Sequence, residues 1–248
     1  MVNTSKLVEI VQNSQNIVFF GGAGVSTESG IPDFRSESGL FAAQKKYGHS
    51  PEEMLSFRFF RRKTDLFFQY YKENLIHLDV KPNETHLALS KLEKNGKLSA
   101  VVTQNIDGLH QAAGSDNVIE LHGTNHRHFC TACGEVYSLE YIMEAANCRG
   151  FVPICAACRS VVRPDVVLYG EQLPEEKLMS AINAIRAADC LIVGGTSLMV
   201  YPAASLLYYF HGRHLVLINK SSTPYDEEAN LVINDSIGTV FLQLMEAL

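Results

Sequence analysis

The fold is decided by one short stretch of the sequence, Ile17-Val-Phe-Phe-Gly-Gly-Ala-Gly24. Its four leading apolar residues, which are β-branched or aromatic, predict a short strand that is buried on both faces. The strand runs directly into a glycine-rich turn, and a helix is expected after the turn. Strand, glycine turn and helix in this order are typical of α/β proteins that bind phosphate groups.

Four further apolar runs follow the same plan. They cover residues 98–103, 118–121, 190–193 and 214–218, and small or polar residues follow each one. Segments with helical character, such as 82–95 and 174–188, lie between several of them. Buried strands that alternate with helices predict an open, mostly parallel, doubly wound sheet of the Rossmann-like α/β class. The polar residues at the strand ends are therefore expected to meet in one crevice at the carboxyl edge of the sheet.

Length and charge narrow the possible functions. The chain has 248 residues, which allows one large domain interrupted by a smaller module. Its 21 Lys and Arg residues against 27 Asp and Glu residues give a net charge of −6. This acidic balance argues against direct nucleic-acid binding, which needs a basic surface. We find no pattern of a signal peptide or a membrane-spanning segment, so a cytoplasmic protein without membrane association is expected.

Two stretches interrupt the alternation of strands and helices. Residues 41–78 are rich in aromatic side chains and helical in pattern, and residues 124–162 contain most of the cysteines. We expect residues 1–40, 79–123 and 163–248 to form the Rossmann-like domain, with 41–78 as a helical insertion and 124–162 as a zinc-binding module. The one basic cluster, residues 58–63, is interpreted as a solvated helix face.

Four cysteines form two pairs with metal-binding spacing. Cys130-Thr-Ala-Cys133 and Cys155-Ala-Ala-Cys158 are two C-x₂-C pairs separated by residues 134–154. Each pair can supply two thiolates from one tight turn, and four thiolates fill the tetrahedral coordination of Zn²⁺. The predicted zinc is therefore structural, with no open position for catalysis. Cys148, His126 and His128 lie nearby and remain alternative ligands, and Cys190 is expected to be a buried strand residue.

The glycine loop departs from the standard dinucleotide fingerprint. Gly22-Ala-Gly24-Val-Ser26 begins like G-x-G-x-x-G, but Thr27 stands in place of the third glycine. No acidic residue follows at the distance that the fingerprint requires for the ribose. A tight turn without a ligand therefore remains an alternative. The next residues, Thr27–Arg35, contain a proline, and the charged residues Asp33 and Arg35 flank the aromatic Phe34. Such a loop would suit a lid over a cofactor.

Taken together, six motifs in this sequence resemble the sirtuin family of NAD-dependent protein deacylases, in its bacterial form. They occur in the family's order and span residues 21–219. These motifs are Gly22–Arg35, Gln104–His110, His122-Gly123, the two cysteine pairs, Tyr169-Gly-Glu171 and Gly195-Thr-Ser197. The resemblance implies a Rossmann-like large domain and a small domain built from a helical insertion and a zinc ribbon.

The resemblance also implies an activity. Sirtuins remove acyl groups from lysine with NAD as a co-substrate, and the products here would be lysine, nicotinamide and O-acetyl-ADP-ribose. By this resemblance His122 is the general base, and Asn105 orients the nicotinamide ribose. The unperturbed pKa of histidine suits proton transfer near neutral pH. One Zn²⁺ per chain would be structural.

Further residues are assigned to NAD by the same resemblance. Asp107 would accept a hydrogen bond from the nicotinamide carboxamide, and Phe34 would shield the reactive carbon from water. His122 and Asn105 also belong to this set. Its other members are Gly22, Ala23, Gly24, Ser26, Thr27, Asp33, Arg35, Gln104, Ile106, Gly195, Thr196, Ser197, Asn219, Ser236 and Ile237.

The resemblance assigns the peptide substrate to two segments, residues 167–171 (the substrate loop) and residues 199–200. An extended peptide would add between them by backbone hydrogen bonding, which gives little sequence preference. The family usually has phenylalanine at position 169. The expected partners are acetyl-lysine proteins or peptides, and a monomer is expected. The residues assigned are Val167, Leu168, Tyr169, Gly170, Glu171, Met199 and Val200.

The preferred acyl group depends on one pair of residues. Family members that favour succinyl or malonyl groups carry Tyr-x-x-Arg in the helical insertion, where arginine can hold the extra carboxylate. Here Tyr70 is followed three residues later by Glu73, although a shift of one residue would offer Lys72. We therefore predict deacetylation, or removal of other apolar acyl groups. The alternative functions are protein mono-ADP-ribosyl transfer and nucleotide binding without catalysis by a module that zinc stabilises.

Overall fold

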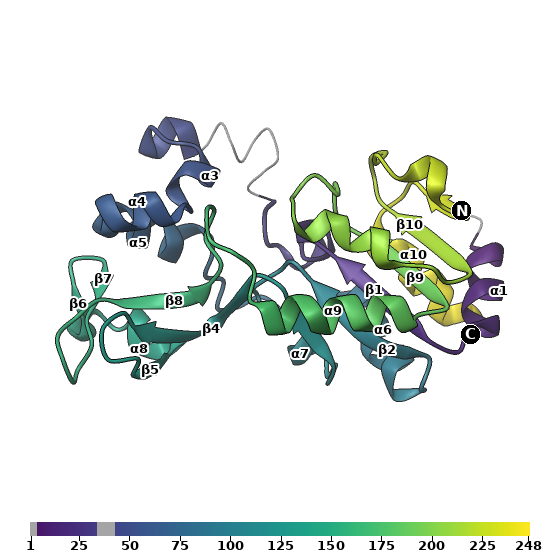
Figure 1. Ribbon diagram of the computed structural model, residues 1–248, viewed down its shortest axis with the longest axis horizontal. Helices are drawn as coiled ribbons and strands as arrows, with labels where there is room; N and C mark the ends of the chain where they lie inside the picture. The colour runs from purple at the N-terminus through teal and green to yellow at the C-terminus, as the bar shows by residue number, and fades with distance from the viewer. Residues whose placement is uncertain (1–3, 34–42) are drawn as a thin grey trace.

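The computed structural model of the chain describes residues 4–33 and 43–248. It has two lobes, one built on a six-stranded sheet and one built on a three-stranded sheet beside a group of helices (Figure 1). Within the described residues, no helix is both long and apolar enough to cross a membrane.

The larger sheet has the predicted parallel, doubly wound topology. Its strand order is β11-β10-β9-β1-β2-β3, and neighbouring strands pair in parallel. From β1 the chain continues to β2 and β3 on one side of the sheet and later to β9, β10 and β11 on the other side. The strand order therefore reverses between β1 and β9. The strands are β1 (Ile17–Gly21), β2 (Leu98–Thr103), β3 (Val118–Glu120), β9 (Cys190–Gly194), β10 (His214–Ile218) and β11 (Leu231–Ile233).

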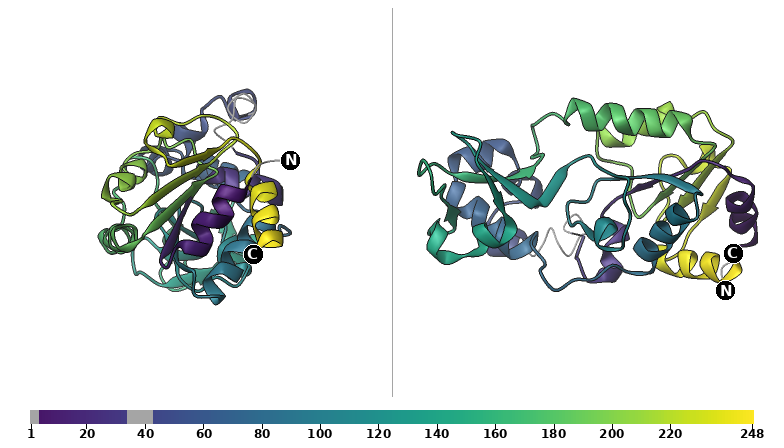
Figure 2. Two further views of the ribbon diagram at one scale, coloured as in Figure 1. Left: turned by 90° about the vertical axis from the view of Figure 1, so that its right-hand side faces the viewer. Right: turned by 90° about the horizontal axis from the view of Figure 1, so that it is seen from below.

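Successive residues of the central strands pack alternately into two separate hydrophobic cores. Phe19 of β1 packs on the face covered by α1, α6 and α10, and Phe20 packs on the opposite face against α9 and η4. Figure 2 shows these helices on both sides of the sheet. The covering elements are α1 (Ser5–Asn13), α6 (Glu84–Lys94), α9 (Glu175–Ala187), η4 (Ala203–Tyr209) and α10 (Ile237–Ala247). Because both faces are covered, every residue of β1 is buried.

The segment after β1 differs from the expected helix. Two short 3₁₀ helices, η1 (Ala23–Val25) and η2 (Thr27–Ser29), stand where a single helix was expected. The Gly24 N–H donates to the Gly195 carbonyl at 2.8 Å, so it is drawn toward the neighbouring loop and away from a helical partner. Gly30 then ends the second turn with φ +92°.

The smaller lobe combines the two stretches that interrupt the sheet. Antiparallel strands β5-β4-β8 form its sheet, and a third core joins this sheet to the helices of the insertion. Its elements are α3 (Pro51–Met54), α4 (Phe57–Arg62), α5 (Thr64–Asn74), β4 (Gly123–Cys130), β5 (Val136–Ser138), α8 (Leu139–Met143) and β8 (Val162–Val166). The remaining short elements are α7 (Leu109–Ala112), η3 (Ala145–Asn147), β6 (Cys148–Arg149), β7 (Val152–Pro153) and η5 (Asp226–Glu228).

Candidate active site

The strand ends meet at the carboxyl edge of the larger sheet. Gly22 follows β1, Gln104 follows β2, His122 comes shortly after β3, Gly195 follows β9 and Asn219 follows β10. Beside them lies a cavity of about 210 Å³ that reaches across to the smaller lobe. This is the place at which open α/β sheets bind their ligands.

Close backbone contact joins the loops after β1 and β9. A Cβ atom on Gly24 would lie 2.8 Å from the Cα of Gly195, and one on Gly195 would lie 2.4 Å from the nitrogen of Val25. Gly195 also adopts φ +60°, where glycine is favoured. Glycine is therefore required at both positions, and the two loops lie in direct backbone contact.

Three polar side chains form a chain of hydrogen bonds inside the crevice. Asn105 Nδ2 donates to Ser26 Oγ at 3.0 Å, and Ser26 Oγ donates to Asp107 Oδ2 at 2.7 Å. The other carboxylate oxygen of Asp107 accepts from the Leu109 N–H at 2.9 Å. These bonds orient the Asp107 carboxylate and the Asn105 amide with respect to each other.

His122 is held through one ring nitrogen. Its Nδ1 lies 2.9 Å from the Gln104 carbonyl oxygen, which can only accept a hydrogen bond. Nδ1 must therefore carry the proton, and in the neutral ring Nε2 is then the basic nitrogen. The Gln104 side chain donates to Thr196 Oγ1 at 3.1 Å, which ties the loops after β2 and β9 together.

The cavity brings together part of the predicted set. The predicted residues that line it are Ala23, Ser26, Gln104, Asn105, Ile106, Asp107, His122, Val167, Leu168, Tyr169, Gly170, Glu171 and Val200. Others stand outside its lining, on the loops, the 3₁₀ helices η1 and η2 and the start of α10, namely Gly22, Gly24, Thr27, Asp33, Gly195, Thr196, Ser197, Met199, Asn219, Ser236 and Ile237. Phe34 and Arg35 lie outside the described residues.

Several residues of the site were not expected. Ile31 and Pro32, which lie within the predicted lid stretch Thr27–Arg35, line the cavity. Tyr71 and Asn125 also line it, and no local pattern marks them. Glu28 accepts hydrogen bonds from Ser236 Oγ and the Gly238 N–H, so it fixes the start of α10 against the glycine loop.

An ion pair shapes the predicted substrate loop. The Arg163 guanidinium donates to both oxygens of Glu171 at 2.8 Å, and Glu171 also accepts from the Leu168 N–H at 2.9 Å. Partial burial alone would raise the pKa of Glu171, but Arg163 and the Leu168 N–H together hold it below its usual range. A charged Glu171 therefore closes the loop on itself.

The substrate loop also contacts its neighbours through backbone hydrogen bonds. Val167 N–H donates to the His122 carbonyl at 2.9 Å, Tyr169 N–H donates to the Leu55 carbonyl at 3.0 Å, and Phe57 N–H donates to the Tyr169 carbonyl at 3.0 Å. With the Leu168 N–H bound to Glu171, the three donors from 167 to 169 all have partners within the chain. A peptide that pairs here must use other backbone groups of the loop.

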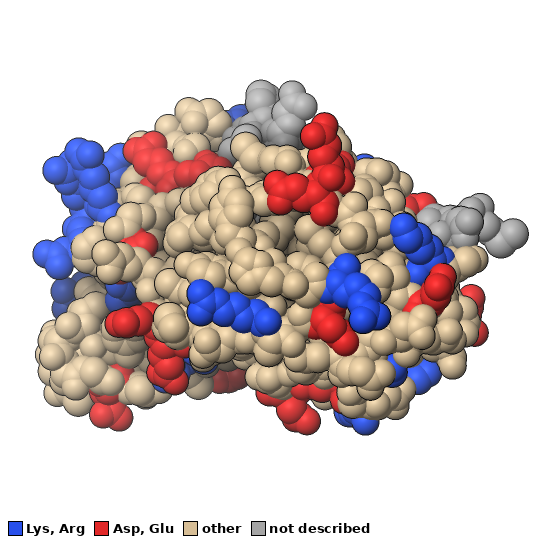
Figure 3. Space-filling view, turned by 45° about the vertical axis from the view of Figure 1, so that its right-hand side comes forward, with Lys and Arg blue, Asp and Glu red and all other residues tan. Residues whose placement is uncertain are grey.

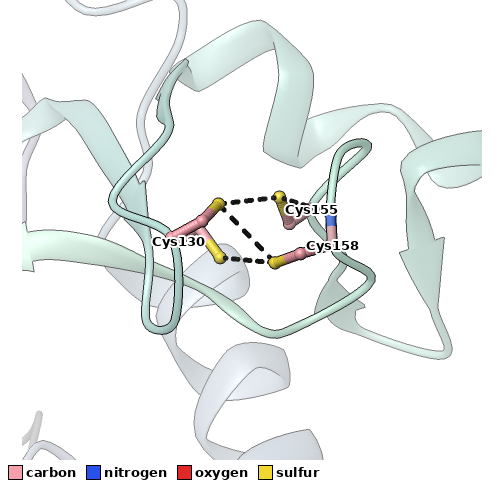
Figure 4. Close-up of side chains that lie close together, drawn as sticks. Cys130, Cys155 and Cys158 are labelled. Carbon is pink, nitrogen blue, oxygen red and sulfur yellow. Dashed lines mark hydrogen bonds between the residues drawn. The ribbon is translucent and has the colours of Figure 1, made fainter.

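The four paired cysteines converge at the tip of the smaller lobe. Their Sγ atoms all lie within 4.8 Å of one another, and Figure 4 shows Cys130, Cys155 and Cys158 pointing toward a common centre. The separations of 3.4 Å between Cys130 and Cys158 and 3.6 Å between Cys133 and Cys155 are too long for disulfides. They approach the sulfur–sulfur edge of about 3.8 Å that follows from tetrahedral Zn–S bonds of about 2.3 Å.

Hydrogen bonds to sulfur support the same interpretation. Tyr137 OH lies 3.1 Å from Cys155 Sγ, and the Ala132 N–H donates to Cys130 Sγ at 3.4 Å.

The three alternative zinc ligands, Cys148, His126 and His128, form their contacts elsewhere. Lys72 Nζ donates to Cys148 Sγ, His126 Nε2 contacts the Asp107 carbonyl oxygen, and His128 Nε2 contacts Tyr71 OH. The donor set thus fits one structural Zn²⁺ held by four thiolates.

The side chains of the basic cluster are exposed. Arg58, Arg61, Arg62 and Lys63 are all exposed on or next to α4. In the space-filling view, basic side chains gather at the upper left, over this end of the smaller lobe, whereas both signs are mixed over the rest of the face (Figure 3).

Comparison with known proteins places these features in context. Residues 22–202 match the model of the Sir2 family. The chain is 54% identical to an NAD-dependent protein deacetylase of Clostridium tetani, covering 100% of this chain and 99% of the relative. It is 56% identical to one of Clostridium perfringens, covering 98% of each.

Solved structures agree with the sequence relatives. A Sir2 structure with p53 peptide and NAD⁺ superposes with a TM-score of 0.89 at 37% identity, covering 99% of this chain and 98% of the other. A Sir2 structure with a propionylated peptide superposes with a TM-score of 0.87 at 36% identity, with the same coverage.

Proposed function

Because the chain belongs to the Sir2 family and is an NAD-dependent protein deacetylase, we propose that the reaction takes place in the cavity at the sheet edge, with His122 as the general base. The observation that carries this proposal is the hydrogen bond from His122 Nδ1 to the Gln104 carbonyl. It leaves the basic nitrogen of the neutral ring at Nε2. A histidine fixed in one tautomer is suited to accept a proton from a ribose hydroxyl.

The residues around the crevice fit an NAD molecule. The loops after β1 and β9 lie in backbone contact at the sheet edge, which supports a pyrophosphate site there, and the Asn105–Ser26–Asp107 chain offers polar partners for the nicotinamide ribose and carboxamide. When bound, NAD supplies the electrophilic ribose carbon that receives the acyl oxygen. The protein's part is to orient the amide of Asn105, hold the carboxylate of Asp107 and provide a base at His122.

The remaining NAD and peptide assignments are also proposals. Gly195, Thr196, Ser197, Asn219 and Ser236 lie on loops at the same sheet edge, which supports a role in holding the adenosine half. Arg163 and Glu171 support the peptide assignment because they hold the substrate loop in one shape beside the cavity.

The organisation of the chain supports three further proposals. The two sheets and three cores support domain limits near 40, 78 and 123, whereas the small sheet extends past the proposed limit at 162 to Val166, the end of β8. A thiolate zinc site is stable in a reducing compartment, which supports a cytoplasmic location. Acetyl-lysine proteins are the proposed partners, and the monomeric state remains a prediction.

The deciding experiment is product analysis by mass spectrometry. The protein is incubated with NAD and an acetyl-lysine peptide, and we expect loss of the acetyl mass together with O-acetyl-ADP-ribose. Added ADP-ribose mass on protein would instead favour mono-ADP-ribosyl transfer, and no turnover would favour the non-catalytic module.

His122 is tested by substitution. His122→Ala is expected to lower kcat at least about 100-fold, because a positioned general base contributes roughly 10²–10⁴-fold. Zinc content and thermal stability should be unchanged. His211→Ala is the matched control, since His211 is an exposed histidine away from the cavity. Retained activity in His122→Ala would remove His122 from its role.

A further inference from the structure

The helical insertion carries a group of positive charges that the proposed reaction does not use. Residues 58–63 contain three arginines and one lysine and no acidic residue, in a chain whose net charge is −6. Arg58, Arg61 and Arg62 follow one another at helical spacings of three and four, so they share one face of α4. This arginine face is exposed, whereas the other side of α4 packs into the core of the smaller lobe.

The arginine face has no carboxylate partner in the part of the chain that the structure describes. None of the ion pairs between described residues includes any of its three guanidinium groups. The acids that flank α4 in the sequence have other partners, because Glu53 pairs with His49 at 2.9 Å and Asp65 accepts from the Phe151 N–H at 3.1 Å. The three charges can therefore receive acidic groups from another molecule.

Close contacts connect the arginine face to the substrate loop. The Phe57 N–H donates to the Tyr169 carbonyl at 3.0 Å, and Ser56 pairs with Tyr169 in a parallel β-bridge. The Arg61 guanidinium lies 6.0 Å from the centre of the Phe57 ring, which is 38% exposed. Tyr169 in turn lines the cavity. A continuous path of contacts thus leads from the cavity through Tyr169 and Phe57 to the arginine face.

We propose that the arginine face binds an acidic segment of the acetylated substrate protein, a few residues away from the acetyl-lysine. The inference rests on the proposed function and deepens it, because it names a class of substrate. A peptide that pairs with the substrate loop is extended and advances about 3.3 Å per residue, so one of its two flanks passes toward α4. Arginine suits this role because a guanidinium can bind a carboxylate through two parallel hydrogen bonds.

The distribution of charge favours a short acidic segment over a nucleic acid. Basic side chains gather over this end of the smaller lobe, and both signs are mixed over the rest of the face that Figure 3 shows. A long polyanion would also meet the rest of an acidic protein, which repels it, whereas a short segment meets only the arginine face. The overall negative charge acts on a whole peptide at long range, and the arginine face acts only on the residues placed against α4.

The test compares kcat/KM for peptides that share one acetyl-lysine core. Three Glu residues are added on the N-terminal or the C-terminal flank, and Gln at the same positions gives the neutral reference. In the wild-type protein we expect one of the two Glu peptides to exceed its Gln reference about 3–10-fold at low salt, since each exposed ion pair contributes modestly. Raising the salt concentration to about 0.5 M should remove the difference.

Two triple variants separate the arginine face from the overall charge. The first should lose the preference for Glu and keep kcat/KM for the Gln peptides, and it consists of Arg58→Gln, Arg61→Gln and Arg62→Gln. The matched control removes three charges from exposed positions on α6 and α9 of the larger lobe and should keep the preference. It consists of Lys91→Gln, Lys94→Gln and Lys177→Gln. Thermal unfolding of each variant checks that the fold is retained.

Equal kcat/KM for the Glu and Gln peptides on both flanks of the wild type would overturn the inference, as would a preference that persists in the arginine variant. Binding of a single-stranded oligonucleotide that the arginine variant loses, without any preference for Glu, would assign the face to nucleic acid instead. A wild type that does not deacetylate the Gln peptides would overturn the proposed function. Fluorescence anisotropy of the labelled Glu and Gln peptides would then still test the arginine face, since it needs no turnover.

Discussion

At the scale of single residues, the roles in this site come from hydrogen-bond partners. His122 and Asp107 could be predicted because they sit in motifs at strand ends, where chain position and chemistry agree. Tyr71 and Asn125 could not, because their contact joins residues 54 positions apart and neither lies in a recognisable pattern. Only the packing of the insertion against β4 brings the two together.

A buried pair of histidines makes stability depend on pH. His86 and His110 have ring centroids 4.6 Å apart, and burial lowers the pKa of His86 to about 4 and that of His110 to about 3. The unfolded chain, with histidine pKa values near 6.5, binds more protons than the folded chain between that pH and pH 4. The free energy of unfolding should therefore fall as pH falls, by up to about 1.4 kcal/mol per pH unit for each histidine.

The measurement is denaturant unfolding from pH 7 to pH 5, with zinc content followed at each pH because protonation can release a thiolate-bound metal. His110→Phe should make the fall with pH shallower, whereas His211→Phe, at an exposed position, should leave it as in the wild type. Equal slopes for wild type and His110→Phe would show that His110 does not contribute.

At the scale of elements, the strands that could be predicted are those that appear as apolar runs. β1, β2, β9 and β10 do so because helices cover both faces of the sheet there, and the half-buried edge strand β3 was predicted from the run 118–121. β4, with two histidines and an arginine, shows no such pattern, and the three-residue β11 was not predicted. In place of the single helix expected after the glycine loop there are two 3₁₀ helices, because the Gly24 N–H bonds to the Gly195 carbonyl and the residues after it bond three positions back.

Metal binding should decide whether the small sheet folds. We expect one Zn²⁺ per wild-type chain, and Cys155→Ser, which removes a buried ligand, should lose the metal and at least about 10-fold in kcat/KM. The physical reason is that a structural zinc site contributes roughly 10–16 kcal/mol of apparent folding energy in small domains. Metal analysis and peptide kinetics give the answer. Cys148→Ser should keep both zinc and activity, and full zinc content in Cys155→Ser would contradict the proposed ligand set.

At the scale of the whole molecule, the proposed reaction centre lies where two lobes with separate cores meet. The predicted organisation of one sheet and two interruptions explains the lobes, since each interruption is a continuous stretch of sequence. Their arrangement around one cavity was not predictable, because it depends on contacts such as the hydrogen bonds from the Tyr169 N–H to the Leu55 carbonyl and from the Phe57 N–H to the Tyr169 carbonyl.

The net charge of −6 should favour basic substrates. An acidic protein raises the encounter rate of a lysine-rich peptide, and salt screens this attraction as the Debye length falls from about 30 Å at 0.01 M to about 8 Å at 0.15 M. We expect kcat/KM for a lysine-rich acetyl peptide to drop several-fold over this range. A neutral peptide around the same acetyl-lysine should change little, and equal salt dependence of the two peptides would rule out steering.

The central position of β1 has a consequence for how the protein is made. β1 pairs with β9, which begins at Cys190, about 170 residues after β1 ends. At a synthesis rate of roughly 5–20 residues per second, β1 waits about 10–30 s on the ribosome for this neighbour. The strands of the zinc-binding sheet all lie between Gly123 and Val166, so that sheet can assemble earlier. The nascent chain therefore exposes an apolar strand for seconds, which makes it a client for chaperones that bind during translation.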